Sequence, residues 1–259
     1  MNQQFVSIDP GAKIGENVQI GSFVTIADNV EIGDGTIIMP HATILPGARI
    51  GKNCRIFPNA VISGIPQDLK FVGEETTAEI GDNTTIRECA TINRGTASKG
   101  KTIVGSNCLI MAYSHIAHDC RLANNIIVGN ASQVAGEVII DDYAILSGGS
   151  LVHQFSRIGE HVMVQGGTRL GKDIPPYCIV GREPVCFMGL NVVGLKRRGF
   201  NNEQIERIQE TYRILYQSGL NTTHALEKIE SEIPDCEEKR IITSFVKEST
   251  RGLVRGPKE

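Results

Sequence analysis

Residues 8–50 read IDPGAKIGENVQIGSFVTIADNVEIGDGTIIMPHATILPGARI, with isoleucine at every sixth position. The same phase continues to residue 170, and 25 of its 28 positions are aliphatic. The three exceptions are Asp68, Glu74 and Ser98. A period of six fits neither the 3.6-residue period of an amphipathic helix nor the simple alternation of a hairpin array. It predicts short strands, each followed by a corner.

The residue two positions before each aliphatic is small or β-branched in the first repeats: Ala12, Val18, Val24, Val30, Thr36, Ala42, Ala48, Cys54 and Ala60. Because residues two apart on a strand point to the same side, both positions face inward. The pattern is typical of the hexapeptide form of the parallel β-helix, in which three consecutive hexads make one triangular coil. Successive coils then stack about 4.8 Å apart.

Glycine and cysteine also occupy fixed positions in this repeat. Glycine directly follows the aliphatic at residues 15, 21, 33, 51, 81, 105, 129, 159 and 171. We expect these glycines to lie at corners that require a positive φ. Cys54, Cys108 and Cys120 fall in the small inward position. Their thiols are therefore expected to fill the core rather than to carry redox chemistry.

Composition excludes several classes of protein. The 26 Lys and Arg residues against 29 Asp and Glu give a net charge of −3, which argues against a nucleic-acid partner bound through bulk positive charge. No apolar stretch reaches the ~18 residues of a transmembrane segment, and MNQQFVSIDP at the start lacks the features of a signal peptide. The seven cysteines form no CxxC pair, as is usual for reduced thiols. We therefore expect a cytoplasmic protein.

Two segments interrupt the repeat, at about 63–79 and 93–101. We expect both to leave the prism as loops within a β-helical domain of residues 1–175. Insertions in repeat proteins gather on one face and often carry binding sites. A loop that is tolerated but has no function produces the same pattern.

Residues 176–259 are expected to form a linker and a small α-helical domain. A helix is predicted over 202–217, where Ile205, Ile208, Tyr212 and Leu215 form one stripe. A second is predicted over 222–232. A third is predicted to begin at Asp235, with Glu238 three residues later as a carboxylate version of the capping box. Such helices are suited to cover the open end of the prism, whose strand edges are otherwise unpaired.

The densest polar cluster is YSHIAHDC at residues 113–120. His118, Gly136 and Gln154 follow one another at intervals of three hexads, so they lie in one column on the outer surface. A histidine beside a backbone N–H without a side chain suits acyl transfer to a hydroxyl, because one removes the proton and the other binds the oxyanion. Asp119 is placed to orient the imidazole. A solvated surface histidine would show the same spacing, so both interpretations remain open.

A metal site is the alternative for the histidines, because some hexapeptide prisms bind zinc through three of them. His153 lies two coils from His118, ~10 Å along the axis. Zinc requires nitrogen ligands at about 2.0–2.1 Å, so His115, His118 and His153 of one chain cannot share an ion. A site between subunits would escape this objection. We expect no metal.

Six segments beyond the hexads carry a resemblance to a known family: VISGIPQDLKFVGEETTAEIG at 61–81, INRGT at 92–96, SHIAHDC at 114–120, LVHQFSRIGEHVMV at 151–164, DIPPY at 173–177 and NVVGLKRRGF at 191–200. With them the chain resembles the acyl-[acyl-carrier-protein]–UDP-N-acetylglucosamine O-acyltransferases. The resemblance implies a left-handed β-helix and a cytoplasmic homotrimer with active sites between subunits. It also implies transfer of an (R)-3-hydroxyacyl chain from acyl carrier protein to the 3-hydroxyl of UDP-N-acetylglucosamine, which opens lipid A synthesis. No cofactor is implied.

Roles are carried over only at matching positions. The resemblance makes His118 the general base, Asp119 its partner and Gly136 the backbone oxyanion donor. The positions matched to substrate contacts are Asp68, Lys70, His115, His153, Gln154, Asn191, Arg197 and Arg198, and Gly166 matches the position that limits acyl length. Guanidinium groups pair well with a pyrophosphate, although a short basic run before a helix is commonly only a solvated face.

The chain departs from the family pattern at Asn93, Glu137 and Val193, where a histidine, a histidine and an acidic residue are usual. The contacts made by these positions stay open. Rival functions are the paralogous N-acyltransferase, a CoA-dependent acetyltransferase, a zinc-dependent hexapeptide carbonic anhydrase and a non-catalytic scaffold. The QDLK and GLKRRGF segments favour the O-acyltransferase.

Overall fold

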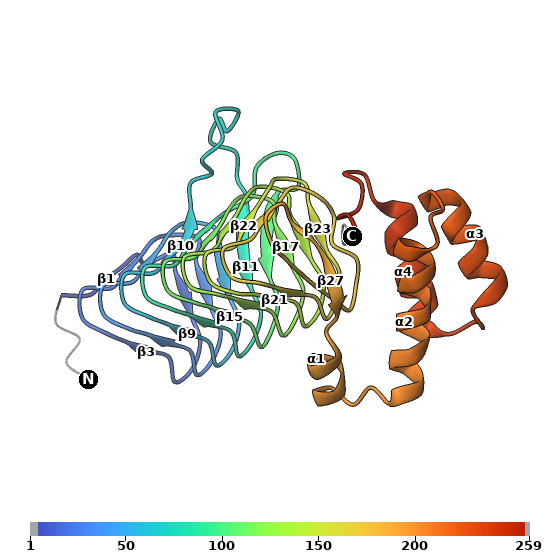
Figure 1. Ribbon diagram of the computed structural model, residues 1–259. Helices are drawn as coiled ribbons and strands as arrows, with labels where there is room; N and C mark the ends of the chain where they lie inside the picture. The colour runs from blue at the N-terminus through green and yellow to red at the C-terminus, as the bar shows by residue number, and fades with distance from the viewer. Residues whose placement is uncertain (1–4, 257–259) are drawn as a thin grey trace.

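The computed structural model describes residues 5–256, so the outermost ends of the two expected domains, 1–4 and 257–259, lie outside the described residues. Short parallel strands stack into a three-sided prism, with a helical segment beyond its last coil (Figure 1). The first sheet contains β1 (Ser7–Ile8), β4 (Thr25–Ile26), β7 (Thr43–Ile44), β10 (Val61–Gly64), β13 (Thr91–Asn93), β16 (His115–Ile116), β19 (Gln133–Val134), β22 (Leu151–Val152) and β25 (Arg169–Leu170).

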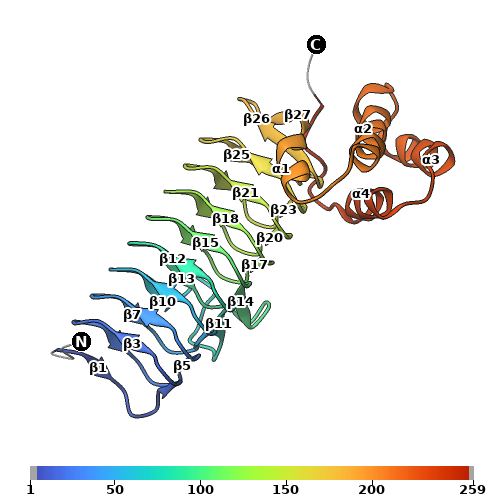
Figure 2. The ribbon, with the colours of Figure 1, turned by 90° about the horizontal axis from the view of Figure 1, so that it is seen from below.

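The other two faces of the prism are built in the same way (Figure 2). The second sheet contains β2 (Lys13–Ile14), β5 (Glu31–Ile32), β8 (Ala48–Ile50), β11 (Thr77–Ile80), β14 (Lys101–Val104), β17 (Arg121–Leu122), β20 (Ile139–Ile140) and β23 (Arg157–Ile158). The third sheet contains β3 (Gln19–Ile20), β6 (Ile37–Ile38), β9 (Arg55–Ile56), β12 (Thr85–Ile86), β15 (Leu109–Ile110), β18 (Ile127–Val128), β21 (Ile145–Leu146), β24 (Met163–Val164), β26 (Cys178–Gly181) and β27 (Cys186–Leu190).

The register of the coils confirms that three hexads make one coil. Ile116 pairs with Val134, and Val134 with Val152, so equivalent aliphatics stack directly over one another. These side chains are buried, as are the small residues two positions before the repeat aliphatics from Val24 to Ala60. Cys54, Cys108 and Cys120 lie in this core, as predicted. At the N-terminal end Ile8 and Ile14 are still 41% and 36% exposed, because no coil covers them within the described residues.

The expectation of positive φ at the repeat glycines is wrong. The left-handed corner lies two residues later, for example at Asn17, Asn53 and Asn125. At all of these glycines except Gly171, glycine is required for a different reason, because the backbone of the next coil passes too close for a Cβ atom. A Cβ on Gly33 would stand 2.6 Å from the carbonyl carbon of Gly51. Asparagine tolerates the left-handed region better than most residues, which explains its place at these corners.

The two interruptions lie where the hexads fail. The first runs between Gly64 and Thr77, and it rises as a long loop from β10 (Figure 1). It is shorter than the predicted 63–79, because Gly64 still pairs with Asn93 and Thr77 with Lys101. The second lies between Asn93 and Lys101. We refer to residues 65–76 as loop 1 and to residues 94–100 as loop 2.

The coil pattern does not end at Leu170, as the sequence indicated. Ile174 forms a bridge with Ile158, and Val180 pairs with Val164 in β24. Both pairs are closer in sequence than three full hexads, so the shortened last coil is hidden from a search at fixed period. The final strand, β27, then turns back antiparallel to β26.

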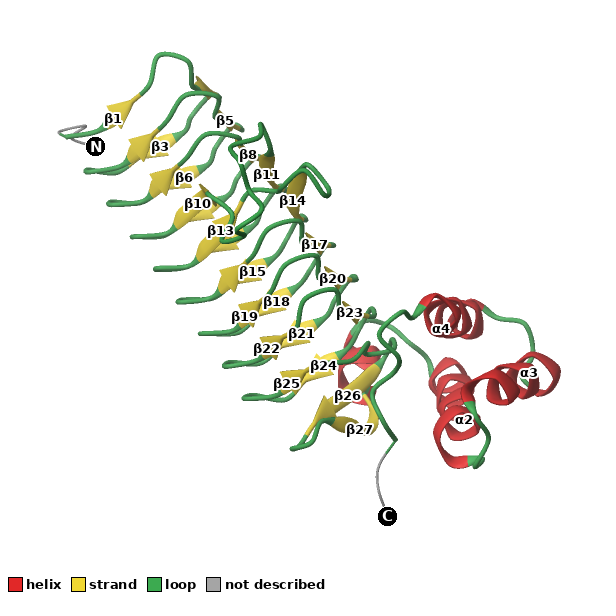
Figure 3. Cartoon of the chain, turned by 90° about the horizontal axis from the view of Figure 1, so that it is seen from above, coloured by secondary structure: helices red, strands yellow, loops and turns green. Residues whose placement is uncertain are grey.

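Up to residue 256, four helices follow: α1 (Val192–Arg197), α2 (Asn202–Gln217), α3 (Thr222–Glu232) and α4 (Glu237–Glu248). The helices at 202–217 and 222–232 are confirmed, whereas α1 was not predicted. Figure 3 shows α2, α3 and α4 grouped beyond the last coil. Tyr212 of α2 stacks on Phe187 of β27 and donates its hydroxyl to the carbonyl of Pro176, which joins the helices to the end of the prism.

The predicted cap of the third helix is wrong. Cys236 occupies the N-cap of α4 and makes no side-chain cap hydrogen bond. Asp235 lies one residue too early and forms an ion pair with Arg240, at 3.3 Å. Glu238 is buried and accepts a hydrogen bond from Gln204 of α2, so a tertiary contact replaces the capping box. None of the helices in the described chain is both long and apolar enough to cross a membrane.

Candidate functional site

A groove of about 640 Å³ runs along the outer face of the first sheet. Its floor is a ladder of outward-facing residues, because His115 pairs with Gln133, Gln133 with Leu151, and Leu151 with Arg169. Gln67 of loop 1 lines the groove as well. The fold therefore brings one column of strand residues and one loop to the same surface.

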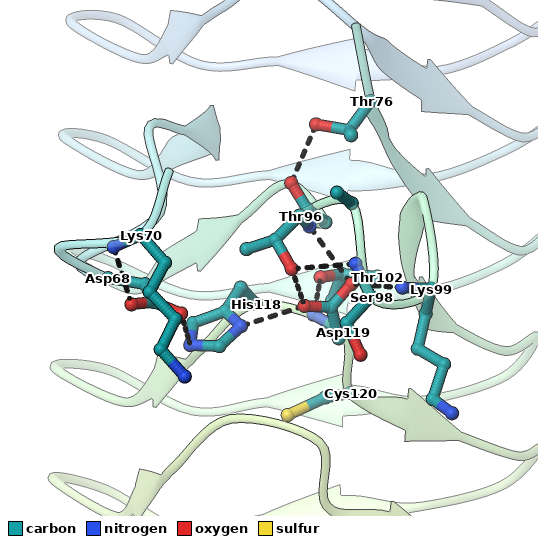
Figure 4. Close-up of polar contacts among 12 residues, drawn as sticks. Asp68, Lys70, Thr76, Thr96, Ser98, Lys99, Thr102, His118, Asp119 and Cys120 are labelled. Carbon is teal, nitrogen blue, oxygen red and sulfur yellow. Dashed lines mark hydrogen bonds and ion pairs between the residues drawn. The ribbon is translucent and has the colours of Figure 1, made fainter. Parts of the chain in front are cut away.

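His118 lies at one side of this groove, two residues after β16. Its side chain is 18% exposed, and its Nδ1 lies 2.8 Å from Oδ2 of Asp119 (Figure 4). Asp119 occupies the left-handed corner, with φ of 61°, and that backbone turns its side chain back towards the preceding ring. The hydrogen bond gives Nδ1 the proton, so the lone pair of Nε2 is free to accept one.

The side chain of Asp119 is completely buried, yet four donors surround its carboxylate. The N–H groups of Thr96 and Lys99 donate to Oδ1 at 2.9 and 3.2 Å. The Thr96 hydroxyl donates to Oδ2 at 2.6 Å, beside the His118 ring. Such a set of donors stabilises the ionised carboxylate in a buried place. The sequence predicts Asp119 beside His118 but not Thr96, because nothing in the TASKG segment shows where loop 2 folds.

Gly136 lies in direct contact with the His118 ring. A Cβ built on this glycine would stand 2.7 Å from Nε2, so only glycine fits while the ring keeps this position. Its N–H finds no hydrogen-bond acceptor in the described chain. At the different corner that follows the second sheet, amides in the same place of the hexad are occupied, for example that of Ser106 by Asn124 and that of Asn124 by Asp142. The column therefore presents an unoccupied donor next to Nε2.

Loop 1 brings Asp68 to the opposite side of the ring. Oδ2 of Asp68 lies 4.0 Å from Nε2 of His118, which is too far for a hydrogen bond. Oδ1 of Asp68 accepts from the N–H of Lys70, whose side chain is exposed beside it (Figure 4). Nε2 of His118 is thus not hydrogen-bonded to this carboxylate.

Three other predicted residues lie in the same groove. His115 accepts or donates a hydrogen bond with Thr91 at 2.7 Å, and burial together with nearby His118 lowers its pKa. His115 is therefore neutral near pH 7. His153 and Gln154 line the groove two coils away from His118, with exposed side chains.

The remaining predicted residues lie elsewhere on the chain. Asn191 is the N-cap of α1, and it also donates to the carbonyl of His161, at 2.9 Å. Arg198 lies over the ring of Tyr143 and donates to its carbonyl, and Arg197 ends the same helix. Gly166 is exposed at a corner after β24. None of these four lines the groove that contains His118.

The three departures from the family pattern differ in their surroundings. Asn93 is buried and donates to the carbonyl of Ile65 at 3.1 Å, so it supports the base of loop 1. Glu137 has φ of 59° at the corner after Gly136. Val193 is 63% exposed on α1. Within residues 5–256, no three His, Cys, Asp or Glu side chains gather in a way that could hold a metal ion.

Comparison with known proteins gives consistent matches. A family model described as "Udp N-acetylglucosamine O-acyltransferase; Domain 2" matches residues 173–254, and "Bacterial transferase hexapeptide (six repeats)" matches 11–46, 29–64 and 101–136. The acyl-[acyl-carrier-protein]–UDP-N-acetylglucosamine O-acyltransferase of Alkalilimnicola ehrlichii is 48% identical, over 96% of each chain. Its counterpart in Stenotrophomonas maltophilia is 44% identical, over 96% of this chain and 95% of the relative.

A solved structure agrees with these relatives. The UDP-N-acetylglucosamine acyltransferase of Bacteroides fragilis is 58% identical, superimposes with a TM-score of 0.97, and matches 98% of this chain and 100% of its own. The expected architecture, a left-handed parallel β-helix followed by a small helical domain, is thereby confirmed. Fold and groove together define a hexapeptide-repeat acyltransferase. The chain belongs to the acyl-[acyl-carrier-protein]–UDP-N-acetylglucosamine O-acyltransferase family.

Proposed function

We propose that the protein transfers an (R)-3-hydroxyacyl chain from acyl carrier protein to the 3-hydroxyl of UDP-N-acetylglucosamine, as the first step of lipid A synthesis in the cytoplasm. The names of the relatives supply the substrates and the reaction. The observation that carries the chemistry is the arrangement of His118: Nδ1 is bound by Asp119 while Nε2 faces a groove beside Gly136. No cofactor is required for this reaction.

The mechanism is direct attack by the sugar hydroxyl. Neutral His118 removes the proton of the 3-hydroxyl as its oxygen attacks the thioester carbonyl. The N–H of Gly136 donates to the oxyanion of the tetrahedral intermediate. When this intermediate collapses, the carbon–sulfur bond breaks and the imidazolium returns its proton to the departing phosphopantetheine sulfur. Asp119 stabilises the imidazolium between these two steps.

A covalent acyl-enzyme is disfavoured by the state of the neighbouring thiol. Cys120 follows the His118–Asp119 pair directly, but its side chain points into the core and is 1% exposed. Burial raises the pKa of this thiol to about 12, and Sγ donates to the carbonyl of Ala135 at 3.1 Å. Cys120 is therefore protonated and out of reach, so it does not act as a nucleophile.

Substrate contacts are assigned to two subunits. Asp68, Lys70, His115, His153 and Gln154 surround the groove of one chain and are proposed to bind the sugar and the acyl donor. Asn191, Arg197 and Arg198 lie outside this groove, so they are proposed to reach the groove of a neighbouring subunit and to bind the nucleotide. Gly166, which has no side chain to fill space, is proposed to leave room for a long acyl chain.

A homotrimer is supported by the outer face of the third sheet. Successive strands place five apolar residues in one ladder: Leu109, Ile127, Ile145, Met163 and Ile179. All five point away from the core and are partly exposed in the single chain. A continuous apolar stripe of this kind marks a protein interface. A second copy packed on this stripe would remove it from water and build a site between subunits.

The test is a transfer assay with UDP-N-acetylglucosamine and 3-hydroxyacyl carrier proteins of increasing chain length, beside CoA donors. We expect product with a long-chain carrier-protein donor. Transfer only from CoA donors would contradict the proposal and indicate an acetyltransferase.

The catalytic role of His118 is tested with His118→Ala in the same assay. Loss of a general base is expected to lower kcat by two or more orders of magnitude without unfolding the protein. His224→Ala is the matched control, because His224 is exposed on α3 and does not line the groove. Undiminished activity of His118→Ala would remove His118 from the mechanism.

A further inference from the structure

Loop 2 closes over the carboxylate of Asp119, although nothing in the repeat requires it to do so. Figure 4 shows Thr96, Ser98 and Lys99 of this loop gathered around the carboxylate, which also faces the His118 ring. Thr96 is 7% exposed, so its hydroxyl is effectively removed from water. Thr96 is 23 residues from Asp119 in sequence, and the contact exists only because the chain stacks one coil on the next.

The hydroxyl of Thr96 has a fixed direction. It accepts a hydrogen bond from the N–H of Ser98 at 3.2 Å and donates to Oδ2 of Asp119 at 2.6 Å. A hydroxyl carries a single proton, so the donor from Ser98 fills an acceptor site and leaves that proton for the carboxylate. Oδ2 is the same oxygen that receives the hydrogen bond from Nδ1 of His118. Thr96 therefore acts on the oxygen that orients the ring.

Loop 2 is itself held by loop 1. Oε1 of Glu74 accepts from the N–H of Ala97 at 2.9 Å, and the hydroxyl of Thr76 donates to the carbonyl of Gly95 at 2.6 Å. Loop 1 also supplies Asp68 to the far side of His118. The charged or titratable groups that face the imidazole are thus Asp119, Asp68 and His115. Loop 1 therefore reaches the His118 ring, and loop 2 reaches the carboxylate of Asp119 that binds this ring.

We propose that Thr96 is a positioning residue for the transfer reaction. Its hydroxyl holds Oδ2 of Asp119 at the point where it receives the Nδ1 proton, and so aims Nε2 of His118 at the acceptor hydroxyl. Two backbone donors hold only Oδ1, so without the hydroxyl the carboxylate can turn and the ring can turn with it. A small misplacement of a general base lowers the rate of the chemical step but not the binding of substrate. The proposal rests on the proposed role of His118.

Three variants test this role. Thr96→Val keeps the shape of the side chain and removes the hydroxyl; we expect kcat to fall on the order of tenfold, with KM for UDP-N-acetylglucosamine unchanged. Thr96→Ser restores the hydroxyl and is expected to restore most of kcat. Thr76→Val is the matched control, because it removes the other buried hydroxyl that holds loop 2 without touching Asp119. An equal fall in kcat for Thr76→Val would mean that loop stability alone is responsible, and would overturn the proposal.

A double-mutant cycle separates positioning from general damage. If Thr96 acts only through Asp119, then Thr96→Val should cause no further loss of kcat in an Asp119→Ala background. The same tenfold loss in that background would overturn the proposal. Thermal unfolding of each variant, measured alongside, identifies any variant that fails to fold. If Thr96→Val does not fold, the comparison of Thr96→Ser with the parent protein is used instead.

His118→Ala in the same series distinguishes the two proposals. Loss of activity in His118→Ala with full activity in Thr96→Val would overturn the role of Thr96 and leave the proposed mechanism intact. Full activity in His118→Ala would overturn both, because Thr96 would then have no base to position.

Discussion

Gly136 lies so close to the imidazole of His118 that a Cβ atom on this glycine would stand 2.7 Å from both Cε1 and Nε2 of the ring. The φ of Gly136 is not in the left-handed region, so its backbone would accept any residue. Glycine is therefore required here by the contact with the ring, and not by the backbone conformation of the corner. His118 and Gly136, which are three hexads apart in the sequence, are thus in van der Waals contact in the structure.

Gly136→Ala is expected to push the imidazole of His118 out of its position. Because that ring is partly exposed, it can swing away at little cost to folding. We expect kcat to fall about 100-fold, as for other losses of oriented catalytic groups, with nearly unchanged thermal stability. Steady-state assays and thermal unfolding of the same preparation check this. Full activity in Gly136→Ala would show that the ring does not need this position.

The repeat glycines should differ from one another in how far they tolerate a methyl group. A Cβ on Gly33 would meet the backbone of Gly51 at 2.6 Å, whereas a Cβ on Gly171 meets nothing within 4 Å. Gly33→Ala is expected to destabilise the protein by roughly 1–3 kcal/mol, since an overpacked backbone contact cannot relax freely. Gly171→Ala, at the same place in the hexad, should change stability by less than about 0.5 kcal/mol. Urea unfolding compares the two, and equal effects would contradict the close-approach argument.

Stability is expected to fall as the pH drops from about 6.5 to 4 because of His161. Its ring is buried between Tyr143 and Tyr177. Burial lowers the pKa of this ring from 6.5 to about 4, and the positive charge of the nearby Arg198 contributes to the shift. Over this range the unfolded chain binds the proton and the folded chain does not, so protonation favours unfolding. The cost reaches about 2 kcal/mol at pH 5 and about 3 kcal/mol below pH 4.

His161→Phe keeps an aromatic ring in the stack and removes this titration. Urea unfolding at pH 7.5 and pH 5, at one protein concentration, should therefore show a smaller loss of stability in the variant than in the parent. Equal pH dependence in both proteins would show that His161 titrates normally in the folded state.

Assembly is expected to depend on the apolar ladder of the third sheet. Ile145→Glu places a carboxylate on that ladder, where burial against a second copy leaves it without a partner. We expect sedimentation to show a trimer for the parent protein and single chains for this variant. Ile139→Glu is the matched control, because Ile139 is equally half-buried but points outward from the second sheet, between Arg121 and Arg157. A trimeric Ile145→Glu variant would exclude the third sheet as the interface.

Much of the site could be predicted because it follows from the coil period. Once three hexads make one coil, Gly136 must lie beside His118, and Asp119 must follow it at a corner. The six-residue period did not predict the last coil, because Val180 pairs with Val164 although the two are closer in sequence than three full hexads. Helix α4 was misjudged at its first turn, because Glu238 is engaged by Gln204 from another helix rather than by its own N-terminus.

The sequence by itself determined the prism, its buried aliphatic ladders and the column that contains His118. These are local consequences of strand geometry, in which the direction of each side chain depends only on its place in the hexad. Only the tertiary structure decided that Thr96 binds Asp119, that Asp68 approaches His118, and that Glu74 holds loop 2 in place. Loops 1 and 2 have no period, so their paths depend on hydrogen bonds between segments distant in sequence, which no local pattern records.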